Sequence, residues 1–134
     1  MSRWSSRKLL ERLAALLAFL IGAMAVFAGS KVVIFHIPVD YHVIPWLPVY
    51  NLTMGIVTVV FVAVALWRYG ARAKRWALAV LLAHTTVLLL LLTVYRNEVA
   101  NESLKAMSVR VTTWLIILGL LTLAERTESS PSGV

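Results

Sequence analysis

The chain has 134 residues, of which 60% are hydrophobic and only 14% charged, and its mean hydropathy is +0.84. Such a composition leaves too little polar surface to cover a core in water, which indicates a membrane protein and excludes an ordinary soluble domain. The formal net charge is +7, but the basic residues form short clusters beside apolar runs, a pattern typical of membrane topology and not of nucleic-acid binding. The chain has no cysteine, which excludes disulfides, thiolate metal sites and thiol exchange.

Four apolar stretches bounded by charged residues are predicted to cross a lipid bilayer as helices. A hydrocarbon core about 30 Å thick takes about 20 helical residues. The predicted spans cover residues 9–29, 49–67, 76–95 and 104–124. The expected fold is therefore an all-α, four-helix transmembrane bundle that forms a single domain over residues 1–124.

The first span carries small residues at every fourth position. Ala14, Ala18 and Gly22 lie on one face of this helix. Small residues allow membrane helices to approach one another closely. We therefore expect this face to contact other membrane subunits or a second copy of the chain, in addition to the lipid that surrounds the bundle.

Residues 30–48 are too apolar for a free loop, yet Pro38, Pro45 and Pro48 prevent a continuous helix. An irregular backbone cannot lie in hydrocarbon with its polar groups unpaired. This Pro-rich segment is therefore expected to be structured, either in the membrane interface or as a cap on the outer mouth of the bundle.

Three potential metal ligands in this segment, His36, Asp40 and His42, are separated by even numbers of residues. In an extended chain such side chains point the same way, and imidazole and carboxylate groups suit zinc or copper. A metal site at these residues is one hypothesis. The alternative is that the two histidines form hydrogen bonds in the loop or respond to pH.

The distribution of Lys and Arg predicts the orientation in the membrane. Nine of the 13 basic residues lie at the N-terminus, in the link of residues 68–75 or in the C-terminal tail, and four lie in the two opposite connections. Under the positive-inside rule, both termini and the basic link face the cytoplasm, which indicates a multi-pass protein of the plasma (inner) membrane. The polar tail, residues 125–134, is expected to be disordered.

His84 lies near the middle of the third span, where an ionisable side chain is costly and is expected to face the bundle interior. Such a histidine suits proton transfer, a hydrogen bond to a quinone, or haem ligation, although haem with two axial histidines would require a second chain. The alternative is a neutral His84 that donates a hydrogen bond to a neighbouring helix. The sequence does not identify a cofactor.

Arg110 lies about one helical turn inside the fourth span and forms an outer polar set with Asn51. It could pair with Glu98 or Glu102, or it could hold an anionic headgroup or substrate. The alternative is that its guanidinium extends to the outer interface.

The layout of the chain resembles that of the small DoxX-type membrane proteins. The resemblance consists of four spans with both termini cytoplasmic, the exit Gly29-Ser30-Lys31 from the first span, and the Pro-rich outer loop. It implies a quinone-linked or thiol-linked redox function. The absence of cysteine disfavours the thiol-linked alternative.

Two functions remain open. The sequence shows no nucleotide motif, catalytic triad or paired acidic site, which favours a non-enzymatic accessory or assembly subunit of a membrane complex. The alternative is a binder or carrier of a small lipophilic or anionic ligand, such as a quinone, a lipid or an organic acid, in an outward-facing cavity. In that case Arg110 and Asn51 would hold the polar head, His84 would exchange protons or hydrogen bonds deeper in, and His36, Asp40 and His42 would close the mouth. The second function is favoured if His84, Arg110 and Asn51 face one cavity, and disfavoured if they face three different neighbours.

Overall fold

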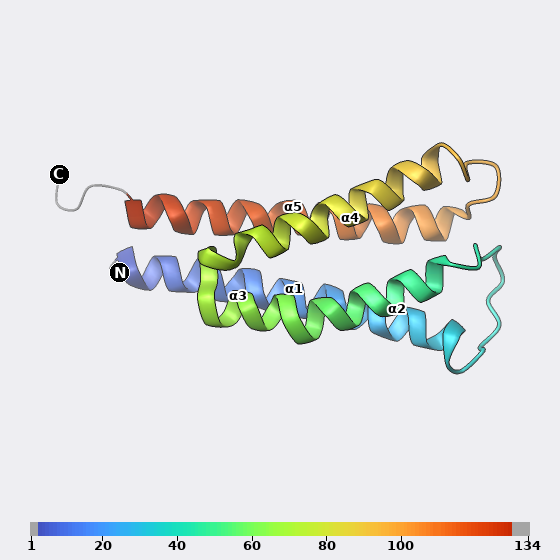
Figure 1. Cartoon of the computed structure of the whole chain (residues 1–134), viewed down its shortest axis with the longest axis horizontal. Coiled ribbons are helices and arrows are strands. Elements are labelled where there is room, and N and C mark those ends of the chain that lie inside the picture. Colours follow the sequence, from blue (N-terminus) through green and yellow to red (C-terminus); the bar gives the residue numbers. More distant parts are fainter. Residues whose placement is uncertain (1–2, 130–134) are drawn as a thin grey trace.

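The computed structural model describes residues 3–129, which contain five α-helices, one π-helical segment and one 3-10 turn and no strand (Figure 1). In chain order they are α1 (Arg3–Val33), α2 (Leu47–Val57), the π-helical η1 (Thr58–Val62), α3 (Ala63–Tyr69), the 3-10 turn η2 (Gly70–Ala73), α4 (Lys74–Leu92) and α5 (Asn101–Ser129). The rod formed by α2, η1 and α3 lies beside α1, and after η2 the chain reverses so that α4 returns beside α5 (Figure 1). We call the end of the bundle that holds η2 the turn end, and the end that holds the connection of residues 34–46 the loop end.

Three helical runs are long and apolar enough to cross a membrane: Ser5–Val33, Leu47–Leu92 and Asn101–Thr127. The sequence predicts four separate spans, and the structure differs because the basic link expected at residues 68–75 is itself helical. It joins the second and third predicted spans into one run of 46 residues. Within this run the chain turns at Gly70, whose φ of 59° is readily adopted only by glycine.

The helix ends also differ from the predicted boundaries. Helix α1 continues beyond residue 29 to Val33, whereas α4 stops at Leu92, three residues before the predicted end of the third span. Helix α5 extends to Ser129 and so includes the first half of the tail for which disorder is expected. Residues 130–134 of that tail lie outside the described part of the chain.

Glycines bring the backbones of α1 and α2 into direct contact. A Cβ atom at Gly29 would lie 2.7 Å from the Leu52 nitrogen, and one at Gly55 would lie 2.8 Å from the Val26 nitrogen. Neither distance leaves room for a side chain. These two helices can therefore pack this closely only because both positions are glycine.

The small-residue face predicted to contact other chains is used inside the bundle. Ala14 and Ala18 have no exposed surface, and a Cβ atom at Gly22 would lie 2.9 Å from Thr58 Cγ2. This face of α1 packs against the neighbouring helices of the same chain.

The apolar core is divided into two clusters along the bundle axis. The cluster at the turn end is built around the fully buried side chains of Leu66, Trp114, Ile117 and Leu121. The cluster at the loop end consists of Ile44, Leu47, Val87, Leu91 and Met107. Because Ile44 belongs to the connection between α1 and α2, this connection is anchored in the bundle at its second half. Its first half is exposed.

Candidate functional site

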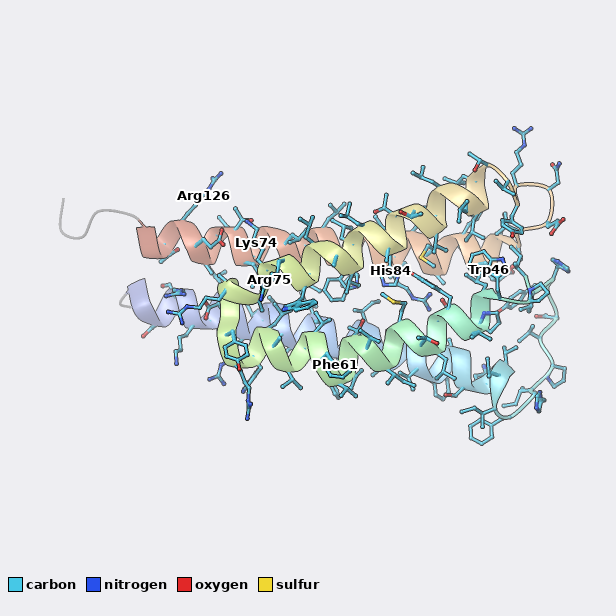
Figure 2. All side chains as sticks on the ribbon, in the orientation of Figure 1. Trp46, Phe61, Lys74, Arg75, His84 and Arg126 are labelled. Atoms are coloured by element: carbon cyan, nitrogen blue, oxygen red, sulfur yellow. The ribbon has the colours of Figure 1, made fainter. Side chains whose placement is uncertain are left out.

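A polar layer separates the two apolar clusters. The buried positions of α4 run from Leu81 through His84 to Val87, and those of α5 run from Met107 through Arg110 to Trp114. Residues three or four positions apart share one face of a helix, so His84 and Arg110 face the bundle interior at the junction of the clusters. Figure 2 shows His84 directed from α4 towards the other helices.

Two adjacent residues of α2 bind the two polar side chains of this layer. The Tyr50 hydroxyl lies 2.8 Å from His84 Nδ1, and the two rings meet edge to face. Arg110 donates a hydrogen bond from Nη1 to Asn51 Oδ1 at 2.5 Å. The polar layer therefore links α2 to α4 through one hydrogen bond and to α5 through the other.

Arg110 is buried without an acidic partner. Only 6% of its surface is exposed, and within residues 3–129 no carboxylate lies within ion-pair distance of its guanidinium. The two acids predicted as partners, Glu98 and Glu102, are exposed. Burying a charged guanidinium is costly unless it is paired, so a buried arginine whose hydrogen-bond partner is a neutral amide favours binding of an anion or another strong acceptor.

A cavity of about 80 Å³ lies above Arg110 on the side of the loop end, between α1, α2 and α5. Its lining includes Arg110 of α5 and Asn51 of α2, Tyr41 and Val43 of the connection, and Glu102 near the start of α5. The cavity combines an apolar wall with a few convergent polar groups, as small-molecule sites do, but at about 80 Å³ it has room for the polar head of a ligand and not for a whole drug-sized molecule, which takes about 300–1,000 Å³.

A second, smaller cavity lies on the opposite side of Arg110. It measures about 10 Å³, and His84, Thr58 and Trp114 are among its lining residues. This is room for about one water molecule. Arg110 lines both cavities, whereas Asn51 lines only the larger one and His84 only the smaller one, so the three residues do not face a single cavity.

The predicted metal ligands are not brought together. His36, Asp40 and His42 are all exposed, and no group of three potential ligands close enough to hold a metal ion occurs in the described chain. The prediction assumes an extended segment, but His36 has a φ of 50° and follows the last turn of α1. A left-handed residue at a helix end redirects the chain and breaks the alternation of side chains.

Sequence reasoning missed two members of the polar layer, Tyr50 and Thr58. From its place near the start of the second predicted span, Tyr50 would be assigned to the aromatic residues of the membrane interface. In the structure its hydroxyl instead lies within hydrogen-bond distance of His84 Nδ1. Thr58 is 2% exposed and begins the π-helical segment η1. The available signal is spacing, since Tyr50, Met54 and Thr58 are four residues apart and therefore share the face of α2 that carries the site.

The π-helical segment η1 lies directly beside the polar layer. The Ala63 amide donates to the Thr58 carbonyl, five residues earlier, and both Thr58 and Val62 are buried. π-Helical turns within α-helices are rare and occur frequently at functional sites. This local departure from α-helical geometry therefore marks the same region of the bundle as the buried arginine.

No family model, curated protein or solved structure matches the chain. The resemblance to DoxX-type proteins consequently has no support from these comparisons. The function must be argued from the site, because a helical bundle by itself does not specify an activity.

Proposed function

We propose that this protein binds a small lipophilic or anionic ligand, such as a quinone, a lipid or an organic acid, in the cavity above Arg110. The observation that carries the proposal is the burial of Arg110 beside this cavity with only a neutral amide as its partner. A ligand that brings a carboxylate or a carbonyl oxygen would add a further acceptor to the one that Asn51 provides and would lower the cost of burying the guanidinium.

The chemistry of the two hydrogen-bonded pairs suggests separate roles. A guanidinium has five N–H donors in a rigid planar fork, and Asn51 accepts from one of its nitrogens, so Arg110 can be oriented by Asn51 while it binds the ligand head. Tyr50 and His84 lie deeper in the layer. Neither lines the larger cavity, so their hydrogen bond would fix the position of α4 relative to α2 and would affect a ligand only through Arg110.

The cavity would open to the outside of the cell under the topology that the sequence predicts. The run Leu47–Leu92 has 46 residues, which as a helix is about 69 Å long, more than twice the hydrocarbon core. Its reversal at Gly70 favours two crossings and hence four spans in all. The basic residues favour a cytoplasmic position for η2 and for the N- and C-terminal ends of the chain. The loop end and its cavity then face outwards.

The accessory-subunit function stays a prediction from the lack of catalytic motifs. The surface predicted for docking, formed by Ala14, Ala18 and Gly22, is occupied by the helices of the same chain. Asn51 and Arg110 line one cavity, which supports ligand binding, whereas His84 lines a different cavity with Arg110.

Native mass spectrometry of the protein extracted gently from its own membrane tests the proposal. We expect a stoichiometric small-molecule adduct, and Arg110→Gln should weaken its binding about 10- to 100-fold, as the loss of a charged hydrogen bond worth about 1.5–3 kcal/mol predicts. Lys105→Gln is the matched control, because Lys105 is exposed on the same helix and does not line the cavity. An adduct that survives Arg110→Gln unchanged, or the absence of any adduct, would refute the proposal.

A further inference from the structure

A second site lies at the opposite end of the bundle, where basic residues from two distant segments meet. A pocket of about 170 Å³ at the turn end is lined by Arg7, Lys8, Glu11, Arg68, Tyr69 and Arg72. Four of these side chains are cationic and one is anionic. The pocket therefore carries an excess of positive charge, which suits a phosphate-bearing ligand.

The single carboxylate of this pocket is already used within the protein. Glu11 Oε1 accepts hydrogen bonds from Arg7 Nε at 2.9 Å and from the Ala71 amide at 3.2 Å. It thereby ties α1 to the turn η2. Arg68, near the end of α3, and Arg72, within η2, have exposed side chains, so the positive charge is held at the mouth of a fixed pocket.

An apolar groove continues from this pocket towards the middle of the bundle. The groove measures about 300 Å³ and lies between α1 and the rod of η1 and α3. Ala15 and Ala63, which are 2% and 6% exposed, form its floor, while Leu16 and Phe19, about half exposed, stand along one side. Because the floor residues are small, the two helices leave a furrow along their line of contact.

Arg68 lines both the basic pocket and the apolar groove, which makes them one continuous feature. From Arg68 the groove follows the chain back to Val59, nine residues or about 14 Å along a helix. Half of a hydrocarbon core about 30 Å thick is about 15 Å. The groove therefore has the length of an acyl chain in one leaflet, measured from the basic pocket inwards.

The wall between pocket and groove is held in place by a cation–π contact. The Arg12 guanidinium lies 3.9 Å from the ring centroid of Trp67, whose side chain lines the groove. This contact fixes the indole at the level where a lipid headgroup meets its acyl chains, a position that tryptophan favours in membranes.

We infer that this pocket and groove form a binding site for one anionic phospholipid, with its phosphate beside Arg68 and Arg72 and one acyl chain along Leu16, Phe19 and Trp67. A free phosphate ion would match the charge but would leave the groove unused. A zwitterionic lipid would match the groove but not the excess of positive charge. Clustered basic residues beside membrane helices are a recognised basis for such lipid selectivity.

Native mass spectrometry of the detergent-purified protein, titrated separately with phosphatidylglycerol and phosphatidylcholine, tests this inference. We expect one tightly bound phosphatidylglycerol per chain and at least a ten-fold preference for it over phosphatidylcholine. Arg68→Gln and Arg72→Gln should each weaken phosphatidylglycerol binding about five-fold. The matched control is Arg75→Gln, which removes one exposed cation from the same end but outside the pocket, and which should change binding less than two-fold.

Two further measurements separate the specific site from general attraction of anionic lipids. Val64→Trp should fill the groove without changing the charge, since Val64 is 45% exposed and lines it, and should weaken phosphatidylglycerol binding. Sodium phosphate at millimolar concentration should not displace the lipid. Equal effects of Arg72→Gln and Arg75→Gln, equal affinity for the two lipids, or displacement by phosphate alone would each overturn the inference. Far-UV circular dichroism checks that every variant keeps its helical content.

Discussion

The contact between α1 and α2 at Gly55 permits a quantitative prediction for the substitution Gly55→Ala. A Cβ atom at this position would lie 2.8 Å from the Val26 nitrogen and 2.9 Å from the Gly22 carbonyl oxygen. Both atoms belong to the backbone, so relief requires the two helices to separate. Overpacking costs about 1–3 kcal/mol and replacing a helical glycine by alanine recovers about 0.5–1 kcal/mol, so we expect a net loss of about 1 kcal/mol, and at most about 2.5 kcal/mol, in the free energy of unfolding.

Gly119→Ala is the matched control for this substitution. Gly119 lies in α5, and no atom lies within 4 Å of the place that its Cβ would occupy. Only the gain in helix propensity remains, so this variant should be more stable by about 0.5–1 kcal/mol. The two identical substitutions are therefore expected to change stability in opposite directions.

Unfolding in mixed micelles, with a rising fraction of sodium dodecyl sulfate and circular dichroism as the readout, measures both variants. Equal shifts of the unfolding midpoint would show that α1 and α2 do not meet at Gly55 as the structure describes. A destabilised Gly55→Ala that keeps its helical content would instead identify helix packing as the property lost. Because α2 also carries Tyr50 and Asn51, this variant should weaken ligand binding as well.

Three more outcomes follow from individual hydrogen bonds. A double-mutant cycle with Tyr50→Phe and His84→Ala should give a coupling of about 0.6 kcal/mol in the free energy of unfolding, the average for polar contacts between membrane helices, and no coupling would contradict the hydrogen bond. Asn51→Ala should weaken ligand binding less than Arg110→Gln does in the same native mass spectrometry titration, because Asn51 orients the guanidinium and does not supply the charge. Glu11→Ala should lower the free energy of unfolding by about 1–3 kcal/mol and Glu11→Gln by less, because the amide oxygen can still accept from the Ala71 amide; equal losses would assign the effect to charge alone.

Helical periodicity and the cost of charge in a membrane place some of the site correctly from sequence. His84 is predicted to face the bundle interior because it lies in the middle of an apolar helix, and it is 4% exposed. Arg110 could extend to the interface or turn inwards. The sequence leaves that choice open because it depends on the neutral partner that α2 provides, Asn51.

Features that depend on tertiary geometry could not be predicted. The expected grouping of His36, Asp40 and His42 assumes an extended chain, and the positive φ of His36 at the end of α1 follows from how that helix terminates. The fusion of two predicted spans into one helical run depends on η2, where a glycine in an unusual conformation lies against the carboxylate of Glu11. Neither the positive φ of His36 nor the approach of Gly70 to Glu11 leaves a periodic signal in the local sequence.

The π-helical segment η1 makes the geometry of the site depend on the number of residues as well as on their identity. In an α-helix each residue turns the chain by about 100°, so deleting one residue from Thr58–Val62 would convert the π-turn to an α-turn and rotate α2 by about that angle relative to α3. The composition and hydropathy of the span would hardly change. Tyr50 and Asn51, however, would no longer face α4 and α5. A single deleted codon in this apolar stretch is therefore expected to disconnect the polar layer while leaving a helix fully able to enter the membrane.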